Sequence, residues 1–423
     1  MNVLYNAATQ LMSGALKLYS RFLPAAPRRK FPQYAKGQQG LMQHIEEAMA
    51  RRGEGPTVWF HAASLGEYQV ARPLISALKK QGPCNIVMTF FSPTGYRALE
   101  GRHPEIDFLF YLPLDTPRAA RRFVETVSPD KAVFIISEFW PNMLQQLKFN
   151  AVPTYLVSAL IRDDSQFFRW YGRTYRRALS AFTRIFVLNE SSRFNLRMLG
   201  YTDVSLSGDP LFDNAYLVAN TPWQDAVIEK FKGGEPMFVA GSISDENDAR
   251  LVCRLIEENP DTRFLLVPHE IKQQAVDALR RMVGAPSALY TESTAETDFS
   301  DTKVLILNTV GKLAYVYRYA TWAYVGGGFT PLLHSVIEAM VYGVPVSFGP
   351  MIQRKVTPNQ LIDLGLGAMV KNPDEIADWF ASLKTDTARL DEIRRGAAAY
   401  VEENIGGCRE LLNAISSGLW QQK

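Results

Sequence analysis

Short apolar runs alternate with helical patterns along most of the chain from residue 57 onward. In the first half, the apolar runs have the length of buried strands, and the stretches between them carry apolar residues at spacings of three and four. The predicted strands are 57–61, 84–90, 108–112, 131–136, 153–157 and 184–188, and the predicted helices are 68–81, 117–127, 166–181 and 190–199. Such alternation is typical of βαβ units, and therefore of a mainly parallel sheet with helices on both faces.

A polar passage with Pro and Gly at 220–235 interrupts this pattern, which then starts again. The second set of predicted strands is 236–240, 263–267, 303–307, 322–325, 344–348 and 367–370, and the helices are 246–258, 270–283, 311–319, 331–342 and 373–385. We therefore predict an α/β fold with two doubly wound, Rossmann-like domains at 36–215 and 216–390. The helices of 391–423 could return to the first domain. Because ligands of such sheets bind beyond the carboxyl ends of the strands, two facing domains would form one cleft.

Residues 1–35 form a separate N-terminal segment with an apolar stripe at helical spacing, formed by Leu4, Ala8, Leu11, Ala15, Leu18 and Phe22. Polar residues interrupt it, so the segment is too polar to predict a membrane-spanning helix, and it lacks the pattern of a secretory signal. Tyr5, Tyr19 and the basic run 28–30 suit a helix that lies in an anionic membrane interface. The alternative is a helix packed on its own domain.

Composition and charge narrow the classes of function. Lys and Arg number 46 against 43 Asp and Glu, and the resulting net charge of +3 is too small to indicate a nucleic-acid-binding protein. The three cysteines form no CxxC pair and the five histidines no ligand spacing, so we predict a reducing compartment and no metal site.

The stretch 325–350 has the most distinctive local chemistry. Gly326, Gly327 and Gly328 follow the apolar run 322–325, and Thr330 with Pro331 would start the helix 331–342. A bare loop before a helix N-terminus can bind phosphate. On that helix His334 and Glu338, four residues apart, would share one face. The alternative is a strand–loop–helix connection that binds no ligand, since the glycine spacing is not that of the dinucleotide-binding motif G-x-G-x-x-G.

Polar residues follow several other predicted strands. Ser64, Gly66 and Glu67 follow the first strand, and Glu138 follows the fourth. We expect the Glu67 carboxylate to lie at a helix N-terminus, where the dipole would keep it ionised and able to act as a base; a first-turn Glu that only complements the dipole is the alternative. In the second domain the equivalent places are 241–242, 268–270 and 310–312. No Ser/His/Asp or Cys/His signature appears, so group transfer is favoured over covalent hydrolysis.

Taken together, an ordered set of motifs resembles the 3-deoxy-D-manno-octulosonic acid (Kdo) transferases along nearly the whole chain. The motifs are HAASLGE (61–67), FSPTGY (91–96), YLPLD (111–115), SEFWPN (137–142), GDPLFD (208–213), GS (241–242) and VGGGF…H…E…GVPVSFGP (325–350). The resemblance implies a GT-B glycosyltransferase that adds Kdo from CMP-Kdo to a lipid A precursor in lipopolysaccharide biosynthesis. It also implies an inverting, metal-independent reaction at the cytoplasmic face of the bacterial inner membrane.

The resemblance assigns roles to particular residues. Glu67 matches the proton acceptor and Glu138 the carboxylate that assists the transition state. The expected CMP contacts are Pro268, His269, Val310, Gly311, Lys312, Ser335, Val336, Ile337 and Glu338. Other expected cleft residues are Ser64, Gly66, Gly241, Ser242, Gly327, Gly328 and His334, and Arg354 or Lys355 could add positive charge.

Four positions depart from the family pattern. Leu211 stands where a basic residue is common, the segment Pro268-His269-Glu270 lacks the arginine of the family's Pro-Arg-His, Ser335 replaces an asparagine, and Ile136 replaces the first glutamate of a Glu-x-Glu pair. Two alternatives therefore remain: a GT-B enzyme with another nucleotide sugar or acceptor, and a catalytically silent sugar-nucleotide binder.

Overall fold

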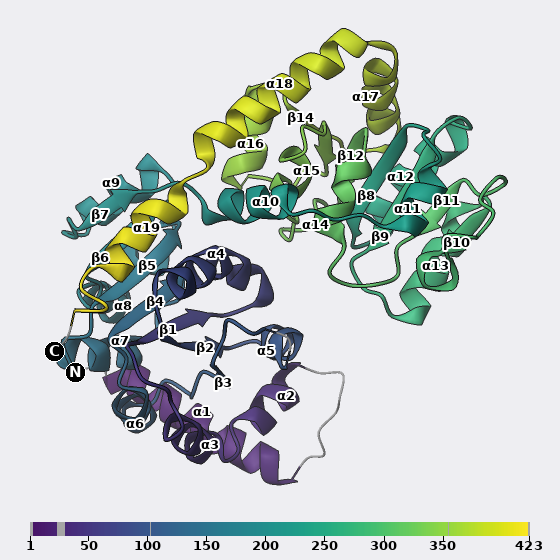
Figure 1. Ribbon diagram of the computed structural model, residues 1–423. Helices are drawn as coiled ribbons and strands as arrows, with labels where there is room; N and C mark the ends of the chain where they lie inside the picture. Colours follow the sequence, from purple (N-terminus) through teal and green to yellow (C-terminus); the bar gives the residue numbers. More distant parts are fainter. Residues whose placement is uncertain (1–2, 23–29, 102, 354, 422–423) are drawn as a thin grey trace. The chain divides into compact units, whose positions relative to one another are not determined.

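The computed structural model describes residues 3–22, 30–101, 103–353 and 355–421, and the chain divides into two compact units (Figure 1). The first contains the residues up to 214 together with those from 405 onward, and the second contains residues 215–404. Each unit has one seven-stranded sheet in which every pair of neighbouring strands is parallel.

In the first unit the sheet has the strand order β3-β2-β1-β4-β5-β6-β7. Its strands are β1 (Thr57–Ala62), β2 (Asn85–Phe90), β3 (Phe108–Tyr111), β4 (Lys131–Ile135), β5 (Thr154–Ala159), β6 (Arg184–Val187) and β7 (Val204–Leu206). The helices are α1 (Val3–Phe22), α2 (Lys30–Gly37), α3 (Leu41–Met49), α4 (Leu65–Gln81), α5 (Pro93–Leu99), α6 (Pro117–Val127), α7 (Pro141–Phe149), α8 (Arg173–Leu179), α9 (Glu190–Met198) and α19 (Gly407–Ser416). One face of the sheet packs against α3, α6 and α7, and the other against α4 and α19. This two-sided cover explains why its strands read as continuous apolar runs.

The second unit repeats this plan with the strand order β10-β11-β9-β8-β12-β13-β14. Its strands are β8 (Met237–Ile243), β9 (Arg263–Pro268), β10 (Ser287–Leu289), β11 (Val304–Ile306), β12 (Trp322–Val325), β13 (Val346–Phe348) and β14 (Gly367–Met369). The helices are α11 (Ala226–Lys232), α12 (Glu246–Glu258), α13 (Gln273–Val283), α14 (Leu313–Val316), α15 (Ile337–Met340), α16 (Val356–Asp363), α17 (Pro373–Thr385) and α18 (Thr387–Asn404).

The chain passes between the units twice. Helix α10 (Pro210–Asn220) contains the first passage, and the second follows α18. After it, α19 packs on the first unit, where Leu411 and Ile415 are fully buried. Asp213 stabilises this return, because its carboxylate accepts the N–H groups of Gly406 (2.8 Å) and Cys408 (3.1 Å).

Helix α1 packs on the first unit through one face only. Thr9 and Leu16 are buried, and the Tyr5 hydroxyl donates to Asp115 Oδ2 (2.8 Å). The opposite side carries Leu4, Ala8, Leu11 and Ala15, which are all exposed and which we call the α1 stripe. The side chains of Leu18, Phe22 and the basic run 28–30 lie outside the described residues. Over the described part of the chain, no helix combines the length and the apolar character needed to cross a bilayer.

Three predicted helices are wrong in extent. The segment 331–342 contains only the short helix α15, because Thr330 forms a local turn in which its hydroxyl donates to Gly327 O (3.1 Å) and accepts Leu332 N–H (3.3 Å). The segment 166–181 is a 3₁₀ turn (Gln166–Phe168) followed by α8, and 311–319 is α14 followed by a 3₁₀ turn (Tyr317–Tyr319).

Candidate active site

Glu67 lies in the first turn of α4, directly after β1. Ser64 is the N-cap residue of this helix: its Oγ accepts the N–H of Glu67 (3.5 Å), and the Glu67 carboxylate in turn accepts the N–H of Ala63. This reciprocal arrangement is a capping box, which fixes the position of the carboxylate at the end of the strand. Gly66 lies between the two, exposed at the mouth of the helix.

The environment of Glu67 raises its pKa to about 7. Burial is the largest cause and the charge of Glu138 the second, while the backbone N–H groups of Ala63 and Ser64 partly oppose them. The backbone donors at the helix N-terminus are thus outweighed by burial and by the second carboxylate, and Glu67 is mainly ionised only above a pH of about 7. A carboxyl group with a pKa near the working pH is well suited to accept a proton.

Glu138 follows β4, the strand next to β1, and is held by two donors. Its Oε2 lies 3.1 Å from His61 Nε2 and accepts the indole N–H of Trp140 (2.7 Å). Burial raises the pKa of Glu138, but the hydrogen bonds and the charge of His61 outweigh it, so the pKa is lowered. The two carboxyl groups thus have pKa values moved in opposite directions, the arrangement expected where one exchanges a proton and the other keeps its charge.

His61 is fully buried in β1 and connects Glu138 to the sheet. Its Nδ1 lies 2.9 Å from Thr89 Oγ1, which also accepts the indole N–H of Trp59 (2.8 Å). Nδ1 also lies 3.2 Å from the Thr89 carbonyl oxygen, so both ring nitrogens of His61 have polar partners. The sequence analysis quoted His61 and Trp140 within motifs but gave neither a role.

Asp115 is a second residue that the sequence analysis missed. It is buried after β3, and its carboxylate accepts the N–H groups of Asn142 (2.9 Å) and Met143 (2.8 Å) at the start of α7, as well as the hydroxyl of Tyr5. Burial raises its pKa to about 6 against the effect of these donors. Because α7 begins directly after Trp140, Asp115 positions the segment that carries Glu138.

In the second unit, the glycine loop after β12 is packed against its own neighbours. A Cβ on Gly326 would lie 2.2 Å from Ser242 O, and one on Gly328 would lie 2.5 Å from Gly349 N. Gly327 has φ +85°, in the left-handed region that favours glycine. The missing side chains thus make room for adjacent backbone, and phosphate binding at this loop stays a prediction.

Asp248, in the first turn of α12, connects this loop to the end of β8. It is fully buried, and its carboxylate accepts the N–H groups of Ser244 (2.9 Å) and Gly327 (2.9 Å) and the hydroxyl of Tyr324 (2.6 Å). These three bonds fix both loops at the carboxyl ends of β8 and β12, where Ser242 has φ +55°.

His269 and His334 lie against each other at the same end of the sheet. Their ring centroids are 4.5 Å apart, and His334 Nε2 lies 3.3 Å from Ser244 Oγ. Burial lowers the pKa of His334 to about 4, with smaller contributions from the charges of His269 and Lys355. His334 precedes α15, so it does not share a helical face with Glu338 as predicted.

Glu338 lies in α15 beside Tyr317. Burial raises the pKa of Glu338 to about 7, and its charge contributes to the raised pKa of Tyr317. The Tyr317 hydroxyl occupies the space beside Gly241, where a Cβ would lie 2.0 Å from that oxygen. Ser335, Val336 and Ile337 are the residues just before and at the start of α15, and Val336 and Ile337 are buried.

Lys312 is engaged in a separate cluster. Its Nζ lies 2.7 Å from Asp225 Oδ2, and the rings of Trp223 and Tyr290 have their centroids 5.3 Å and 5.0 Å from it. Tyr290 donates to the same Asp225 oxygen (2.7 Å). Beside it Val310 is exposed and Gly311 has φ +84°, while Pro268 ends β9 and Arg354 lies outside the described residues.

Comparisons with known proteins agree on one family and one fold. The family model for 3-deoxy-D-manno-octulosonic-acid transferase (kdotransferase) matches residues 34–214. The 3-deoxy-D-manno-octulosonic acid transferase of Bordetella pertussis is 27% identical over 384 residues, which cover 86% of this chain and 87% of that protein. The transferase of the same name from Aquifex aeolicus is 26% identical, over 85% of this chain and 94% of that protein.

Among solved structures, a UDP-N-acetylglucosamine 2-epimerase matches with a TM-score of 0.59 at 13% identity, over 88% of this chain and 98% of that chain. MurG from Acinetobacter baumannii matches with a TM-score of 0.51 at 13% identity, over 86% and 99%. At these identities the structures show the fold alone. The predicted GT-B fold class, with two parallel α/β sheets, is confirmed.

Proposed function

We propose that this chain is a Kdo transferase, a glycosyltransferase that transfers Kdo from CMP-Kdo to a lipid A precursor in lipopolysaccharide biosynthesis, because it is similar to such transferases over most of its length. The observation that carries the proposal is the pair Glu67 and Glu138 on neighbouring strands, with pKa values moved in opposite directions. The reaction is inverting and needs no metal ion, as the family resemblance implies.

In this reaction Glu67 is the base. A hydroxyl of the acceptor attacks the anomeric carbon of Kdo, and Glu67 takes the hydroxyl proton as the new C–O bond forms. The bond between that carbon and the CMP phosphate oxygen breaks, and CMP leaves with the electron pair. Attack from the face opposite the leaving group inverts the configuration. Glu138 stays ionised and stabilises positive charge that develops on the sugar.

The donor is bound by the second unit. We place CMP beside Pro268, His269, Val310, Gly311, Lys312 and the residues from Ser335 to Glu338. The neutral His334 beside Ser244 supports a site for uncharged hydrogen-bonding groups, and a Glu338 carboxyl with a pKa near 7 can exchange hydrogen bonds with ribose hydroxyls. Lys355, whose pKa is lowered by burial, is a cation near His334 that can approach the phosphate.

The acceptor is a lipid, so the enzyme must work at a membrane. The α1 stripe supports this, because Leu4 is 86% and Leu11 75% exposed on a helix whose opposite side is docked. Isolated helices that keep one apolar face outside commonly lie in a membrane interface. We propose peripheral binding to the cytoplasmic face of the bacterial inner membrane.

The test is transfer of labelled Kdo from CMP-Kdo to a lipid A precursor, followed by mass spectrometry of the product. We expect a product heavier by one or more Kdo units. The absence of transfer to any lipid A precursor contradicts the proposal.

A second candidate function follows from Lys312. Lys312 is paired with Asp225, and the arginine that the family has beside His269 is absent. Fewer cations are therefore free to bind a phosphate, which favours another donor or a catalytically silent nucleotide binder. A panel of nucleotide sugars distinguishes the first possibility. Calorimetric binding of CMP without transfer from any donor distinguishes the second.

A further inference from the structure

The first unit presents an exposed aromatic residue on a braced turn between its 3₁₀ segment and α8. Trp170 is 91% exposed and its neighbour Tyr171 is 52% exposed. The turn is tightly built: a Cβ on Gly172 would lie 2.2 Å from Gln166 O, and Gly172 N–H donates to Arg169 O (2.9 Å). The tight turn therefore keeps Trp170 at the surface, where its large aromatic side chain is exposed to water.

The anchors of this turn are buried. Phe167 lies in the core of the unit, and Arg176 Nη1 donates to Phe167 O (2.6 Å). Trp and Tyr placed in this way are typical of a membrane interface, where the ring enters the headgroup layer and the polar edge stays in contact with water.

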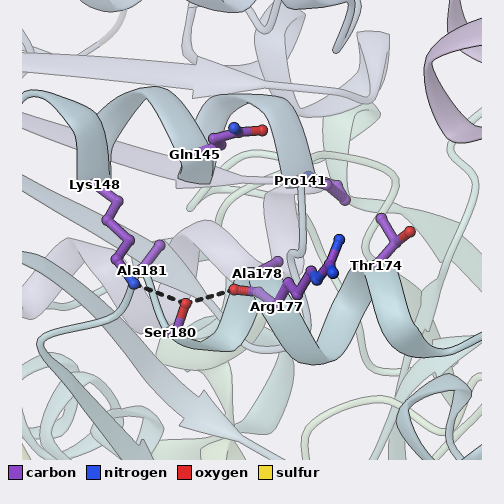
Figure 2. A pocket seen from close by; sticks show the side chains of 8 residues that line it. All are labelled: Pro141, Gln145, Lys148, Thr174, Arg177, Ala178, Ser180 and Ala181. Atoms are coloured by element: carbon purple, nitrogen blue, oxygen red, sulfur yellow. Dashed lines mark hydrogen bonds between the residues drawn. The ribbon is translucent and has the colours of Figure 1, made fainter. Parts of the chain in front are cut away.

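Next to the turn, a pocket of about 200 Å³ opens between α7 and α8 (Figure 2). Its eight lining residues include the cations Lys148 and Arg177 and no carboxylate. Lys148 Nζ donates to Ser180 Oγ (2.9 Å), so it stands at one end of the pocket, and the Arg177 guanidinium extends toward Thr174 and Pro141 at the other end. Two cations beside one pocket are complementary to a phosphate group.

The pocket, the turn and α1 belong to the same part of the first unit. Tyr5 of α1 and Tyr175 of α8 are in edge-to-face contact, with ring centroids 6.3 Å apart. Phe149, which is 83% exposed, directly follows Lys148. The apolar residues of α1, Phe149 of α7, the basic pocket between α7 and α8, and Trp170 in the turn before α8 thus belong to neighbouring segments.

We propose that Trp170 and the pocket of Lys148 and Arg177 form a second lipid-binding surface, in which the phosphate of an anionic phospholipid headgroup binds between the two cations while the Trp170 ring enters the interface. This surface is distinct from the α1 stripe and from Glu67 and Glu138. It orients the first unit on the membrane by a second point of attachment, which a single helix cannot provide.

The experiment measures partition of the full chain onto vesicles of phosphatidylethanolamine alone and of phosphatidylethanolamine with phosphatidylglycerol. These vesicles contain neither donor nor acceptor, so the result is independent of whether the transfer reaction occurs. Each cation near an anionic surface contributes about five-fold to binding. We therefore expect Lys148→Gln/Arg177→Gln to weaken binding to the anionic vesicles by roughly 25-fold and to leave binding to the neutral vesicles unchanged.

The matched control for charge is Arg281→Gln/Lys371→Gln, which removes two exposed cations from the second unit. For the aromatic residue, Trp170→Ala should weaken binding to both kinds of vesicle, with Phe194→Ala, at another exposed aromatic residue of the first unit, as control. Circular dichroism and thermal melting identify any variant that fails to fold.

The proposal is overturned if the Lys148/Arg177 variant binds anionic vesicles as well as its control does, or if its loss of binding is equal on neutral vesicles. The proposal is also overturned if vesicle binding depends on Trp170 and not on Lys148 and Arg177. It is overturned as well if this surface binds a protein partner and does not bind vesicles.

Discussion

At the scale of single residues, Glu67 is the side chain on which the proposed chemistry depends. Glu67→Gln keeps the size of the side chain and an oxygen to accept the Ala63 N–H, but it cannot take a proton from the acceptor. We expect turnover to fall by roughly 10²–10⁴-fold, the range for a lost general base. In the unmodified enzyme, kcat/KM should rise with pH through about 7, because only the ionised carboxylate accepts the proton.

Glu100→Gln is the matched control, because it neutralises an exposed carboxylate at the end of α5. Steady-state transfer measured from pH 5 to pH 9 provides both the rate and the profile. Near-unchanged turnover of Glu67→Gln, or a rising limb that persists in this variant, would remove Glu67 from the role of base.

The same residue should also make stability depend on pH. A carboxyl group has an ordinary pKa of about 4.3 in the unfolded chain, whereas Glu67 in the folded protein has a pKa of about 7. Between these values the folded state binds the proton more tightly, so the contribution of Glu67 to stability declines as the pH rises through this window. Glu67→Gln should therefore raise the free energy of unfolding by about 1–3 kcal/mol at pH 8 and change it little at pH 4. Urea unfolding at both pH values measures this difference; equal effects at the two would show that the shifted pKa is not the cause.

Residues of the site differ in how far the sequence reveals them. Glu67 and Glu138 are predictable because each follows an apolar strand, and parallel strands bring their carboxyl ends to one edge. The roles of Asp115 and Asp248 are not, because each acts through donors on other segments, such as Asn142 and Gly327. His61 is hidden for another reason: it is an interior residue of a buried strand, where a histidine is usually a satisfied core group.

At the scale of secondary-structure elements, α1 provides a prediction about membrane binding. Leu4→Ser/Leu11→Ser removes the two largest side chains of the α1 stripe and leaves Tyr5, Thr9 and Leu16 to hold the helix. Full burial of a leucine is worth about 1.5–3 kcal/mol, so we expect binding to fall by at least tenfold while the fold is kept. Flotation of the full chain with liposomes is the measurement.

The control for this change is Leu217→Ser/Leu364→Ser. Both leucines are exposed: Leu217 lies in α10, and Leu364 directly follows α16. Flotation of the α1 variant equal to that of this control would mean that the stripe does not enter the membrane.

Elements differ in how well the sequence predicts them. Long apolar runs and amphipathic stretches identify most of the core strands and the helices α6, α12 and α17 within a few residues. The helices α5 and α7 are not among the predicted helix ranges, although Pro93 and Pro141 stand at their first turns, where proline is favoured. The edge strands β7 and β10 have only three residues each, too few for a periodic pattern. The helix 331–342 fails for a local reason, the turn formed by Thr330, and for a tertiary reason, the close approach of Gly328 to Gly349 that fixes the loop.

At the scale of the whole molecule, the two passages of the chain between the units make the C-terminal end part of the first core. Sequence could suggest that the last helices return, but the partner that holds them is Asp213, nearly 200 residues earlier. It accepts the N–H groups of Gly406 and Cys408, and it lies close enough to Asp209 to help burial raise the pKa of that carboxyl to about 6. Charge-assisted hydrogen bonds of this kind contribute about 1.5–3 kcal/mol each.

Asp213→Ala should therefore detach the start of α19 before the rest of the first unit unfolds. Without the carboxylate, the N–H groups of Gly406 and Cys408 lose their acceptor, and the helix keeps its apolar contacts through Leu411 and Ile415 and the hydrogen bond from the Tyr155 hydroxyl to Ala414 O (2.9 Å). Hydrogen exchange followed by mass spectrometry should show faster exchange over 405–416 than in the parent chain, with β1 and β4 unchanged. Asp378→Ala, in α17 of the second unit, is the control. Uniformly faster exchange across the first unit would instead show that the return of the chain is required for the whole core, and unchanged exchange over 405–416 would show that α19 is held without the Asp213 carboxylate.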